Sequence, residues 1–560
     1  MSAAKKKSAG AKSGASKAAA RELRKVLIAN RGEIALRIIR ACRELGIQSV
    51  AVYSDADTGA PHVRAADEAV HIGPAPASQS YLRGDHLIEV AKQVGADAIH
   101  PGYGFLSERE WFAKAVEDAG LIWIGPPASA IAAMGSKTAA RTLAIKAGTP
   151  VVPGTTEALK DAAEAKKLAA EFGLPVLLKA AAGGGGKGMR VVRDLNEIEG
   201  ALGSAQREAQ NAFGDDAVYI EKYIEGPRHV EIQVLADQHG NCISLGEREC
   251  SIQRRHQKMI EEAPSVAVSP ELRKQMGDAA VAAAKAAGYV NAGTCEFLLD
   301  KHGNFYFLEM NTRIQVEHPV TELVMGIDLV QWQLRIARGE TLPFTETPKP
   351  NGWAIECRIT SEDPANGFLP STGRITHLQL PAGPGVRWDG GITTGSVVGL
   401  NYDPMLAKLI VHAPTRELAI ARMERALREL VLHGVETSRE FHLRMMADED
   451  YRTSNVTIQW LEAKLPEILA RKPSAETMRV AVIAGALFAQ KDRGGRPGTG
   501  VAAGQASGAA AGPAAAGAAA FPSSARSGRS PLAASTPMPI GLSAGAMSSP
   551  AEKRVRAAAR

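Results

Sequence analysis

The sequence predicts a mixed fold that combines α/β and α+β parts. Near the N-terminus, strand-like apolar runs alternate with helical stretches, which is typical of an open parallel sheet. Further along, apolar strands are joined by short loops, which is typical of antiparallel hairpins. The chain has 560 residues and a mass of 59.0 kDa, which suggests roughly three or four domains.

The net charge of +6 is distributed unevenly. Residues 1–25 carry eight Lys and Arg against one Glu, and residues 491–560 carry nine against two acidic residues. Residues 26–490 are therefore mildly acidic, with a net charge of −8. Because the basic residues lie in two low-complexity tails, we expect no nucleic-acid binding. The sequence has no run of about 18 apolar residues, so we expect no membrane span.

Both ends of the chain are predicted to be disordered. Residues 1–23 form a basic arm without the apolar stretch of a secretion signal; a transit peptide is less favoured because Lys replaces the usual Arg. Residues 473–560 form an Ala/Gly/Pro-rich tail, which cannot bury enough apolar surface to offset the entropy of ordering. The five cysteines form no C-x-x-C pair, so we expect reduced thiols and a cytoplasmic protein.

Residues 24–134 are predicted to form an open α/β domain. An apolar run at residues 25–30 precedes a helical pattern from Arg31 to Cys42. Further strand-like runs follow at residues 49–53, 98–100 and 121–124. Gly32 is a single glycine and not the full dinucleotide-binding fingerprint, so no catalytic role is predicted for this domain.

A glycine-rich loop lies between two apolar strands. Four consecutive glycines, residues 183–186, are followed by Lys187 and Gly188. Backbone N–H groups in such a loop can bind phosphate oxygens, and Lys179 adds a cation at the loop's start. Strand-forming residues follow the loop, which distinguishes it from a P-loop. A flexible linker is the alternative, but the apolar strands on both sides favour a phosphate-binding lid.

A predicted hairpin brings two acidic residues together. With its turn centred between residues 302 and 303, Glu296 and Glu309 lie directly opposite each other. Like charges in this position repel unless a proton or a cation lies between them. With Asn311, two residues further along, they form an oxygen site suited to Mg²⁺ or Mn²⁺. A shift in strand register would break this pairing.

A polar stripe continues from this hairpin, with Glu309, Asn311, Arg313, Gln315 and Glu317 at every second position. If the segment stays extended, these side chains share one face. Arg313 could then bind a small planar anion, and Glu317 could act as a base. The solvent-facing side of an edge strand is the alternative interpretation.

Two further polar patterns accompany the stripe. His229, Glu231 and Gln233 alternate with apolar residues, and residues 253–258 form a basic cluster. Such a cluster is usually a solvated loop, but beside a phosphate site it could bind a nucleotide.

These motifs resemble those of biotin carboxylases, members of the ATP-grasp superfamily. The resemblance extends over residues 24–472 and rests on six segments: residues 28–33, 100–108, 183–189, 221–223, 253–258 and 309–320. It implies an N-terminal α/β domain at 24–134, an ATP-grasp domain at 135–348 with a lid at about 155–225, and a C-terminal biotin carboxylase domain at 349–472.

The resemblance also implies roles for individual residues. It places the following near ATP: Lys137, Lys179, Gly183, Gly184, Gly185, Gly186, Lys187, Gly188, Met189, Glu221, Lys222, Tyr223, His229, Gln253, His256 and Lys258. It implies that Glu296 and Glu309 hold the metal. It further implies that Arg313, Gln315 and Val316 bind bicarbonate, that Glu317 deprotonates it, and that Arg358 stabilises the enolate of biotin. Arg313, Glu317, Arg358 and Lys258 are the expected catalytic residues.

The implied reaction is ATP-dependent carboxylation of biotin. Bicarbonate attacks the γ-phosphate to give carboxyphosphate, which breaks down to CO₂ and phosphate, and the phosphate takes the proton from biotin. No Met-Lys-Met-type biotin site is found, so we expect a separate biotin carboxyl carrier protein and a carboxyltransferase, and the resemblance implies a homodimer.

The expected pathway is that of an acetyl-CoA or other acyl-CoA carboxylase. The alternatives are a component of pyruvate carboxylase, another ATP-grasp ligase that joins a carboxylate to an amine, or a scaffold that acts through its basic tails.

Overall fold

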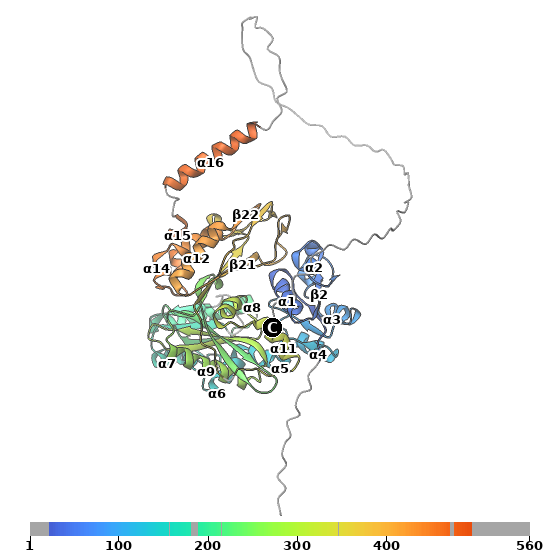
Figure 1. The fold of residues 1–560 in the computed structure, drawn as a ribbon. Helices are drawn as coiled ribbons and strands as arrows, with labels where there is room; N and C mark the ends of the chain where they lie inside the picture. The colour runs from blue at the N-terminus through green and yellow to red at the C-terminus, as the bar shows by residue number, and fades with distance from the viewer. Residues whose placement is uncertain are drawn as a thin grey trace, which may run out of the picture. The chain divides into compact units, whose positions relative to one another are not determined.

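The computed structural model describes residues 22–155, 157–180, 189–213, 215–344, 346–470 and 475–494 (Figure 1). The chain divides into two units, residues 1–473 and residues 474–560. The predictions of disorder for residues 1–21 and 495–560 lie outside the described residues. No helix in the described ranges is long and apolar enough to span a membrane.

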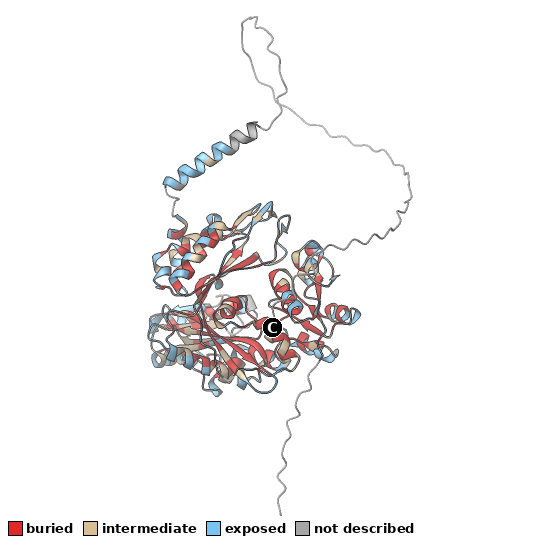
Figure 2. Ribbon diagram, in the orientation of Figure 1, coloured by how far each residue is buried: buried red, intermediate tan, exposed pale blue. Residues whose placement is uncertain are grey.

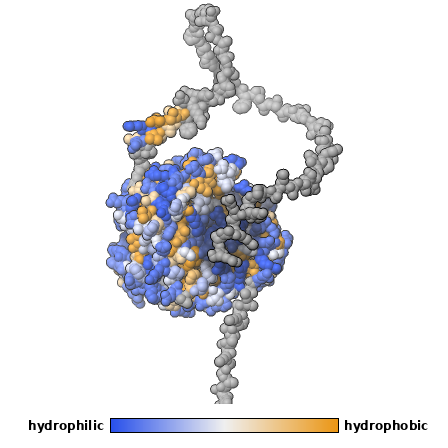
Figure 3. Space-filling view, in the orientation of Figure 1, coloured by the Kyte–Doolittle hydropathy of each residue, from blue (hydrophilic) through white to orange (hydrophobic). Residues whose placement is uncertain are grey.

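The described part of the second unit is helix α16, Ala475–Gly494. Treating the whole of residues 473–560 as a tail was therefore wrong at its start. Alanine and other apolar residues dominate residues 480–489, and they favour a helix that the overall composition of the tail concealed. Val480, Val482 and Leu487 on this helix are exposed, and Figure 3 shows the apolar colouring of its described part.

The N-terminal part is a five-stranded parallel sheet with the order β3-β2-β1-β4-β5. Its elements are β1 (Lys25–Ile28), α1 (Gly32–Glu44), β2 (Gln48–Tyr53), α2 (Pro61–Ala65), β3 (Glu68–His71), α3 (Gly84–Gln93), β4 (Ala98–His100), α4 (Glu110–Asp118) and β5 (Ile122–Trp123). The predicted parallel sheet and first helix are confirmed. Strand β3 was missed because it is a short edge strand with a polar, mostly exposed sequence.

The order of this sheet reverses between β1 and β4. Asn30, which follows β1, donates hydrogen bonds from its amide to the carbonyls of Pro101 and Tyr103, both at 2.7 Å. These bonds join the loops after the two strands. In open parallel sheets, the crevice at such a reversal is where ligands bind.

A small three-stranded antiparallel sheet, in the order β7-β6-β8, forms a separate layer with two helices. Its elements are α7 (Ala162–Phe172), β6 (Val176–Ala180), β7 (Met189–Val192), α8 (Ile198–Phe213) and β8 (Val218–Lys222). Leu178, Ile220 and Leu202 are among the buried residues between sheet and helices. The two strands predicted around the glycine loop are thus present, whereas Gly183 to Gly188 lie outside the described residues.

The largest sheet has eight antiparallel strands in the order β13-β12-β9-β10-β11-β14-β21-β19. These strands are β9 (Arg228–Ala236), β10 (Cys242–Arg254), β11 (Gln257–Ala263), β12 (Asn291–Leu299), β13 (Phe305–Asn311), β14 (Trp353–Thr360), β19 (Val386–Gly390) and β21 (Met405–Ala413). The sheet is continuous across residue 348, because β11 pairs with β14. Figure 2 shows that most of its strands are buried.

Helices cover this large sheet, and the short strands of the C-terminal part form separate two-stranded sheets. The helices are α5 (Ala128–Gly135), α6 (Lys137–Lys146), α9 (Pro270–Ala286), α10 (His318–Met325), α11 (Leu329–Ala337), α12 (Arg416–Glu429), α13 (Arg439–Met446), α14 (Glu449–Arg452) and α15 (Trp460–Ala470). The short strands are β15 (Glu362–Asp363), β16 (Leu369–Pro370), β17 (Gly373–Arg374), β18 (His377–Gln379), β20 (Val397–Val398) and β22 (Val431–His433).

Candidate active site

Charged side chains from five neighbouring strands converge on one face of the large sheet. We call the following residues the central cluster: His229 and Glu231 on β9, Arg248 on β10, Lys258 and Glu261 on β11, Glu296 on β12, Arg358 on β14, and Glu317 at the start of α10. All eight have little or no exposed side chain. Burying so many charges is unfavourable unless each is paired, and the cluster is a continuous network of ion pairs.

The acidic hairpin is present with the predicted pairing of Glu296 and Glu309. The turn, however, is not centred where it was predicted, because Leu299 pairs with Phe305 and Phe297 with Phe307. A bulge between Glu296 and Phe297 then shifts the register by one residue and restores the pairing of the two acids. Glu296 is buried and Glu309 is exposed, since β13 is an edge strand.

The polar stripe does not continue as a strand, which corrects the prediction of an extended segment. Strand β13 ends at Asn311, and α10 begins at His318. The side chains nevertheless meet, because Asn311 and Gln315 both donate hydrogen bonds to Glu296 Oε1, at 2.9 and 3.3 Å. Arg313 donates to Gln315 Oε1 at 2.9 Å and to Asn311 Oδ1 at 3.1 Å.

Lys258 links three carboxylates. The basic segment around it is a hairpin whose two turn residues, Arg255 and His256, both have positive φ, as the tight turns of hairpins require. This turn leaves His256 exposed and directs Lys258 into the cluster. Lys258 Nζ donates to Glu231 at 2.5 Å, to Glu317 at 2.7 Å and to Glu296 at 2.9 Å.

These contacts set the charge states. Burial alone would raise the pKa of Glu317, but Lys258, Arg358 and Arg248 outweigh it and hold that pKa well below its usual range. Burial opposes ionisation of Lys258 as well, yet the surrounding glutamates raise its pKa well above the ordinary value. Glu296 follows the same pattern, because Lys258 and His229 lower its pKa against the effect of burial. These charged groups therefore stay ionised at neutral pH.

Arg248 is a buried support that the sequence did not reveal. Its guanidinium donates to Glu231 Oε1 at 2.5 Å, to Gln233 Oε1 at 2.8 Å and to the hydroxyls of Thr321 and Thr294 at 2.9 and 3.0 Å. Arg248 therefore fixes the second polar pattern, that of residues 229–233, to the cluster. The alternation of polar residues there was the available signal for Glu231, which was not predicted as a site residue.

Arg358 connects the proposed base to a second acidic pair. It donates to Glu317 Oε2 at 2.9 Å and to Glu261 Oε1 at 2.6 Å. Burial raises the pKa of Glu261 to about 7. The negative charge of Glu317 adds to this effect, and the positive charge of Arg358 opposes it. Glu356 lies opposite Glu261 on β14, and neither of its oxygens has a hydrogen-bond partner among the described residues. Burial holds its pKa well above the usual range.

The N-terminal domain contacts the candidate site through two acidic residues, Glu108 and Glu33, which were not predicted as site residues. Glu108, in the loop after β4, accepts hydrogen bonds from Arg313 Nε at 3.0 Å and from the backbone N–H of Thr312 at 3.3 Å. Glu33, in the first turn of α1, lies 3.3 Å from Lys408 Nζ on β21. Lys408 Nζ in turn donates to the carbonyl of Val316 at 2.9 Å, so Lys408 links α1 to the segment before Glu317.

The residues predicted to contact ATP lie partly elsewhere. Lys179 and Glu221, on the adjacent strands β6 and β8, form an ion pair at 2.6 Å. Lys222 Nζ donates to the carbonyl of Gly173 at 2.8 Å, and Tyr223 Oη accepts a hydrogen bond from Gln459 at 3.4 Å.

The remaining residues of this group are only partly described. Gln253 is buried and donates to the carbonyl of Cys250 at 2.9 Å. Met189 begins β7 and Lys137 begins α6, but the side chain of Lys137 lies outside the described part.

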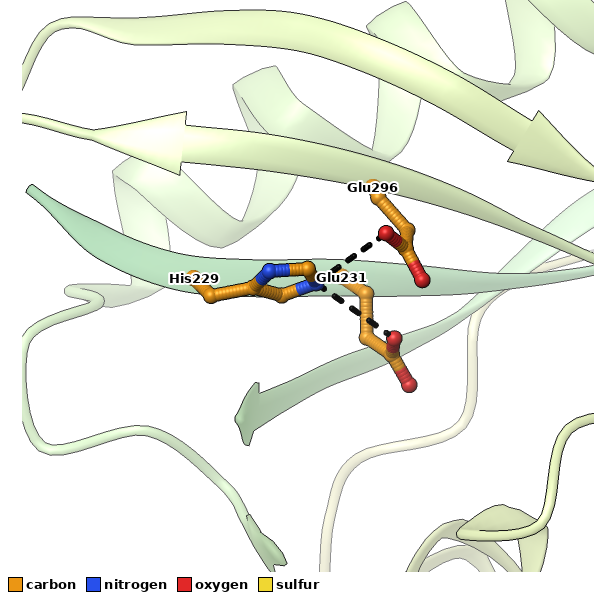
Figure 4. Close-up of side chains that lie close together, drawn as sticks. All are labelled: His229, Glu231 and Glu296. Atoms are coloured by element: carbon orange, nitrogen blue, oxygen red, sulfur yellow. Dashed lines mark ion pairs between the residues drawn. The ribbon is translucent and has the colours of Figure 1, made fainter. Parts of the chain in front are cut away.

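The cluster offers a donor set for a hard cation. His229, Glu231 and Glu296 each place a ligand atom within 4.8 Å of the others, and Figure 4 shows His229 pointing between the two carboxylates. His229 Nε2 lies 3.3 Å from Glu296 and 3.9 Å from Glu231. Asn311 lies beside Glu296 and donates to it from its amide nitrogen, while its amide oxygen accepts from Arg313. Glu309 adds a second carboxylate on the same face of the hairpin. Oxygen donors of this kind suit Mg²⁺ or Mn²⁺.

The chain is similar to known proteins over most of its length. Residues 22–131 match the model of the biotin carboxylase N-terminal domain, residues 136–345 that of the carbamoyl-phosphate synthase L chain ATP-binding domain, and residues 356–463 that of the biotin carboxylase C-terminal domain. Biotin carboxylase 1 of Bacillus subtilis is 53% identical over 442 residues, which cover 79% of this chain and 98% of that protein.

Two other relatives are named for different carboxylases. A pyruvate carboxylase component from Methanothermobacter thermautotrophicus is 53% identical over 78% of this chain and 89% of that protein. The biotin carboxylase domain of Hydrogenobacter thermophilus 2-oxoglutarate carboxylase, solved as a dimer with MgADP, ADP and bicarbonate, superimposes with a TM-score of 0.75. That structure is 48% identical and covers 81% of this chain and 100% of its own.

Proposed function

Because the chain belongs to the biotin carboxylase family, we propose that it carboxylates biotin on a separate carrier protein, using ATP and bicarbonate. The observation that carries this proposal is the contact between Lys258, Glu317 and Arg358 in one buried network. A base, a cation beside that base and a second cation for an anionic substrate are the groups that this reaction needs.

Each residue has a distinct proposed task. Arg313 and Gln315, joined by a hydrogen bond of 2.9 Å, present N–H donors to bicarbonate, and Glu317 takes its proton. Bicarbonate then attacks the γ-phosphate of ATP, ADP leaves, and the resulting carboxyphosphate breaks down to CO₂ and phosphate. The phosphate takes the proton from the ureido nitrogen of biotin, and that nitrogen adds to CO₂. Arg358 holds the ureido oxygen of biotin and stabilises the negative charge that forms there. Because Arg358 lies beside Glu317, the deprotonation of bicarbonate and the carboxylation of biotin would take place at one location.

A divalent ion fits this arrangement. Glu296, Glu309 and Asn311 would hold Mg²⁺ or Mn²⁺, which supplies positive charge for the phosphates of ATP when bound. Lys258 already neutralises Glu296 from the protein side, so the two carboxylates of the hairpin do not both depend on the metal. Lys179 and the loop of residues 183–189 are the proposed contacts of the phosphates from the lid.

The finer proposal is that the chain serves an acetyl-CoA or other acyl-CoA carboxylase as a homodimer, with a biotin carboxyl carrier protein and a carboxyltransferase as partners. A homodimer is supported by the dimeric structure of the 2-oxoglutarate carboxylase domain. The final acceptor is tested by co-purifying the transferase and supplying acetyl-CoA, propionyl-CoA, pyruvate and 2-oxoglutarate in turn. Carboxylation of a 2-oxoacid alone would overturn the acyl-CoA assignment.

The activity itself is tested with free biotin. We expect ATP hydrolysis that requires both bicarbonate and biotin, and we expect Glu296→Gln to impair the Mg²⁺-dependent turnover and to raise the Mg²⁺ concentration that it needs. Glu117→Gln makes the same change at an exposed position of α4 and serves as the matched control. ATP hydrolysis that is indifferent to bicarbonate would reject the proposal. Unchanged activity of Glu296→Gln at every Mg²⁺ concentration would reject the metal assignment.

A further inference from the structure

Two buried glutamates lie opposite each other beside Arg358. Glu261 on β11 and Glu356 on β14 are direct partners in the antiparallel ladder, so their side chains share one face of the sheet. Neither residue has any exposed surface. One oxygen of Glu261 and both oxygens of Glu356 have no hydrogen-bond partner among the described residues. None of the tasks assigned above uses either glutamate.

The pair is stable only if it holds a proton. Two ionised carboxylates directly opposite each other repel, and buried polar atoms without a partner are unfavourable. With one proton on Glu356, its O–H can donate to the free Oε2 of Glu261. Hydrogen bonds from a carboxylic acid to a carboxylate are short and strong. Burial raises the pKa of both groups, which agrees with a shared proton.

The surroundings of the pair supply one bonded cation. The charged and titratable groups that face it are Lys258 on β11, Arg358 and Cys357 on β14, Cys250 on β10, Glu317 at the start of α10, Lys408 on β21 and Tyr451 on α14. Burial raises the pKa of the two thiols and of the phenol well above their ordinary values, so these groups stay neutral. Lys258 and Lys408 bond to other partners, and within the described chain only Arg358 donates to the pair.

Glu261 fixes the direction of the Arg358 side chain. Arg358 Nε donates to Glu261 Oε1 at 2.6 Å, and Nη2 donates to Glu317 Oε2 at 2.9 Å. Because the guanidinium is planar, bonds at two of its nitrogens also set the direction of the third. Nη1 makes no hydrogen bond to the described residues, and the side chain is 17% exposed. This end of Arg358 is therefore available to a substrate.

We propose that Glu261 and Glu356 share one proton and are positioning residues for Arg358, which acts fully on biotin only while Glu261 is ionised. The inference rests on the proposed function, because that function assigns the ureido oxygen of biotin to Arg358. Uptake of a second proton by the pair would neutralise Glu261, weaken its bond to Nε and leave the guanidinium to turn toward Glu317.

The form of the pair with one proton is thus the active one, and turnover of biotin should fall as the pH decreases. Burial raises the pKa of Glu261 to about 7, so this loss should occur between pH 8 and pH 6.

The role of Glu261 is tested through the pH dependence of kcat/KM for free biotin, at saturating ATP and a fixed concentration of bicarbonate. The result is expressed as the ratio of wild type to variant, which cancels every titration that the two proteins share. Glu261→Gln keeps an acceptor for Arg358 Nε but not the charge. We expect its ratio to rise at least fivefold from pH 6 to pH 8, with the KM for ATP within twofold of the wild-type value.

Glu249→Gln is the matched control. Glu249 is also buried, and burial raises its pKa, but it accepts hydrogen bonds from Ser251 and Ser265 and makes none with Arg358. Its ratio should stay within twofold of one at both pH values. A ratio for Glu261→Gln that is equal at pH 6 and pH 8 would overturn the inference, because a merely structural role lowers activity at both.

The role of Glu356 is tested by two substitutions of similar size. Gln keeps an N–H donor toward Glu261, whereas Met removes it. We expect Glu356→Gln to leave the midpoint of the pH profile unchanged. Glu356→Met should raise the midpoint by about one pH unit, because Glu261 loses the donor that favours its ionised form. Equal midpoints for the two variants would overturn the shared proton, and this comparison holds even if Glu261→Gln does not fold.

Failure of this inference differs from failure of the proposed function. Wild-type protein whose ATP hydrolysis needs neither biotin nor bicarbonate would remove the proposed function. Biotin-dependent turnover in the wild type, with a constant ratio for Glu261→Gln, would overturn the role of the pair alone.

Discussion

Replacing Glu33 by Gln should change how the stability of the protein depends on pH. Glu33 is buried at the start of α1, where burial raises the pKa of its carboxyl to about 7. Lys408 on β21 opposes this shift, Asp389 on β19 reinforces it, and Arg387 on β19 opposes it more weakly. Tyr103 donates a hydrogen bond to Glu33 from the loop after β4.

The size of the effect follows from the two pKa values. The pKa rises from 4.5 in the unfolded chain to about 7, and each unit corresponds to about 1.36 kcal/mol. The folded protein therefore holds this proton more tightly, by about 3 kcal/mol. This contribution to the free energy of unfolding is fully present below pH 4.5 and is lost as pH rises through about 7. Gln at this position binds no proton, so its stability does not depend on this titration. Between pH 5.5 and 8, the free energy of unfolding of Glu33→Gln should therefore rise by about 2 kcal/mol relative to that of the wild type.

The measurement is urea unfolding of the full chain, followed by tryptophan fluorescence at pH 5.5, 6.5, 7.2 and 8. Glu117→Gln is the control, because that carboxylate is exposed and its removal should leave the pH dependence of the wild type. The free energies of unfolding of Glu33→Gln and of the wild type are compared at each pH. If their difference stays constant over this range, Glu33 does not carry the proton, and the reasoning from burial is refuted.

The remaining predictions concern the central cluster and its neighbours. Glu317→Gln should lower bicarbonate-dependent turnover by about 10²–10⁴-fold and change the affinity for ATP far less; the opposite pattern in steady-state kinetics would reassign the residue. Arg248→Met should destabilise the protein by about 3 kcal/mol in urea, because the buried Glu231 loses one of its two cations and keeps only Lys258. Arg207→Met, exposed on α8, is its control, and equal midpoints for the two variants would disprove the supporting role of Arg248. Glu356→Gln should cost less than about 1 kcal/mol in the same assay, since burial keeps this carboxyl protonated; a loss as large as that of Arg248→Met would show that it is ionised.

The hairpin shows how far local sequence patterns can go. Two apolar strands around a polar turn were sufficient to predict the pairing of Glu296 with Glu309. The prediction assumed a regular ladder of paired residues. In the structure, the turn is centred one half-residue earlier, and a bulge follows between Glu296 and Phe297. The two deviations cancel at the acids. A bulge adds a residue without a distinctive sequence signal, so periodicity alone could not reveal it.

Long-range partners were beyond reach of the sequence. Glu108 and Arg313 are 205 residues apart, and Glu33 and Lys408 are further still. Each is an ordinary charged residue in its own segment, and only the packing of the N-terminal sheet against the large sheet makes it part of the site. Arg248 likewise appears in an alternating strand, where its burial depends on neighbours on three other elements. The motif-based resemblance compensated for this at Lys258 and Arg358 but not at Glu231 or Arg248.

The charge state of Glu317 constrains how it can act as a base. In the structure, Lys258 and Arg358 donate to its two oxygens at 2.7 and 2.9 Å and lower its pKa well below the usual range. A carboxylate held in this way is a weak base, whereas an effective general base has a pKa near the working pH. Anionic substrates offer both cations new partners, and each contact transferred from Glu317 to substrate raises the basicity of that carboxylate. In the proposed reaction, the same cations that keep Glu317 ionised before binding would therefore allow proton removal to begin only once the substrates are in place.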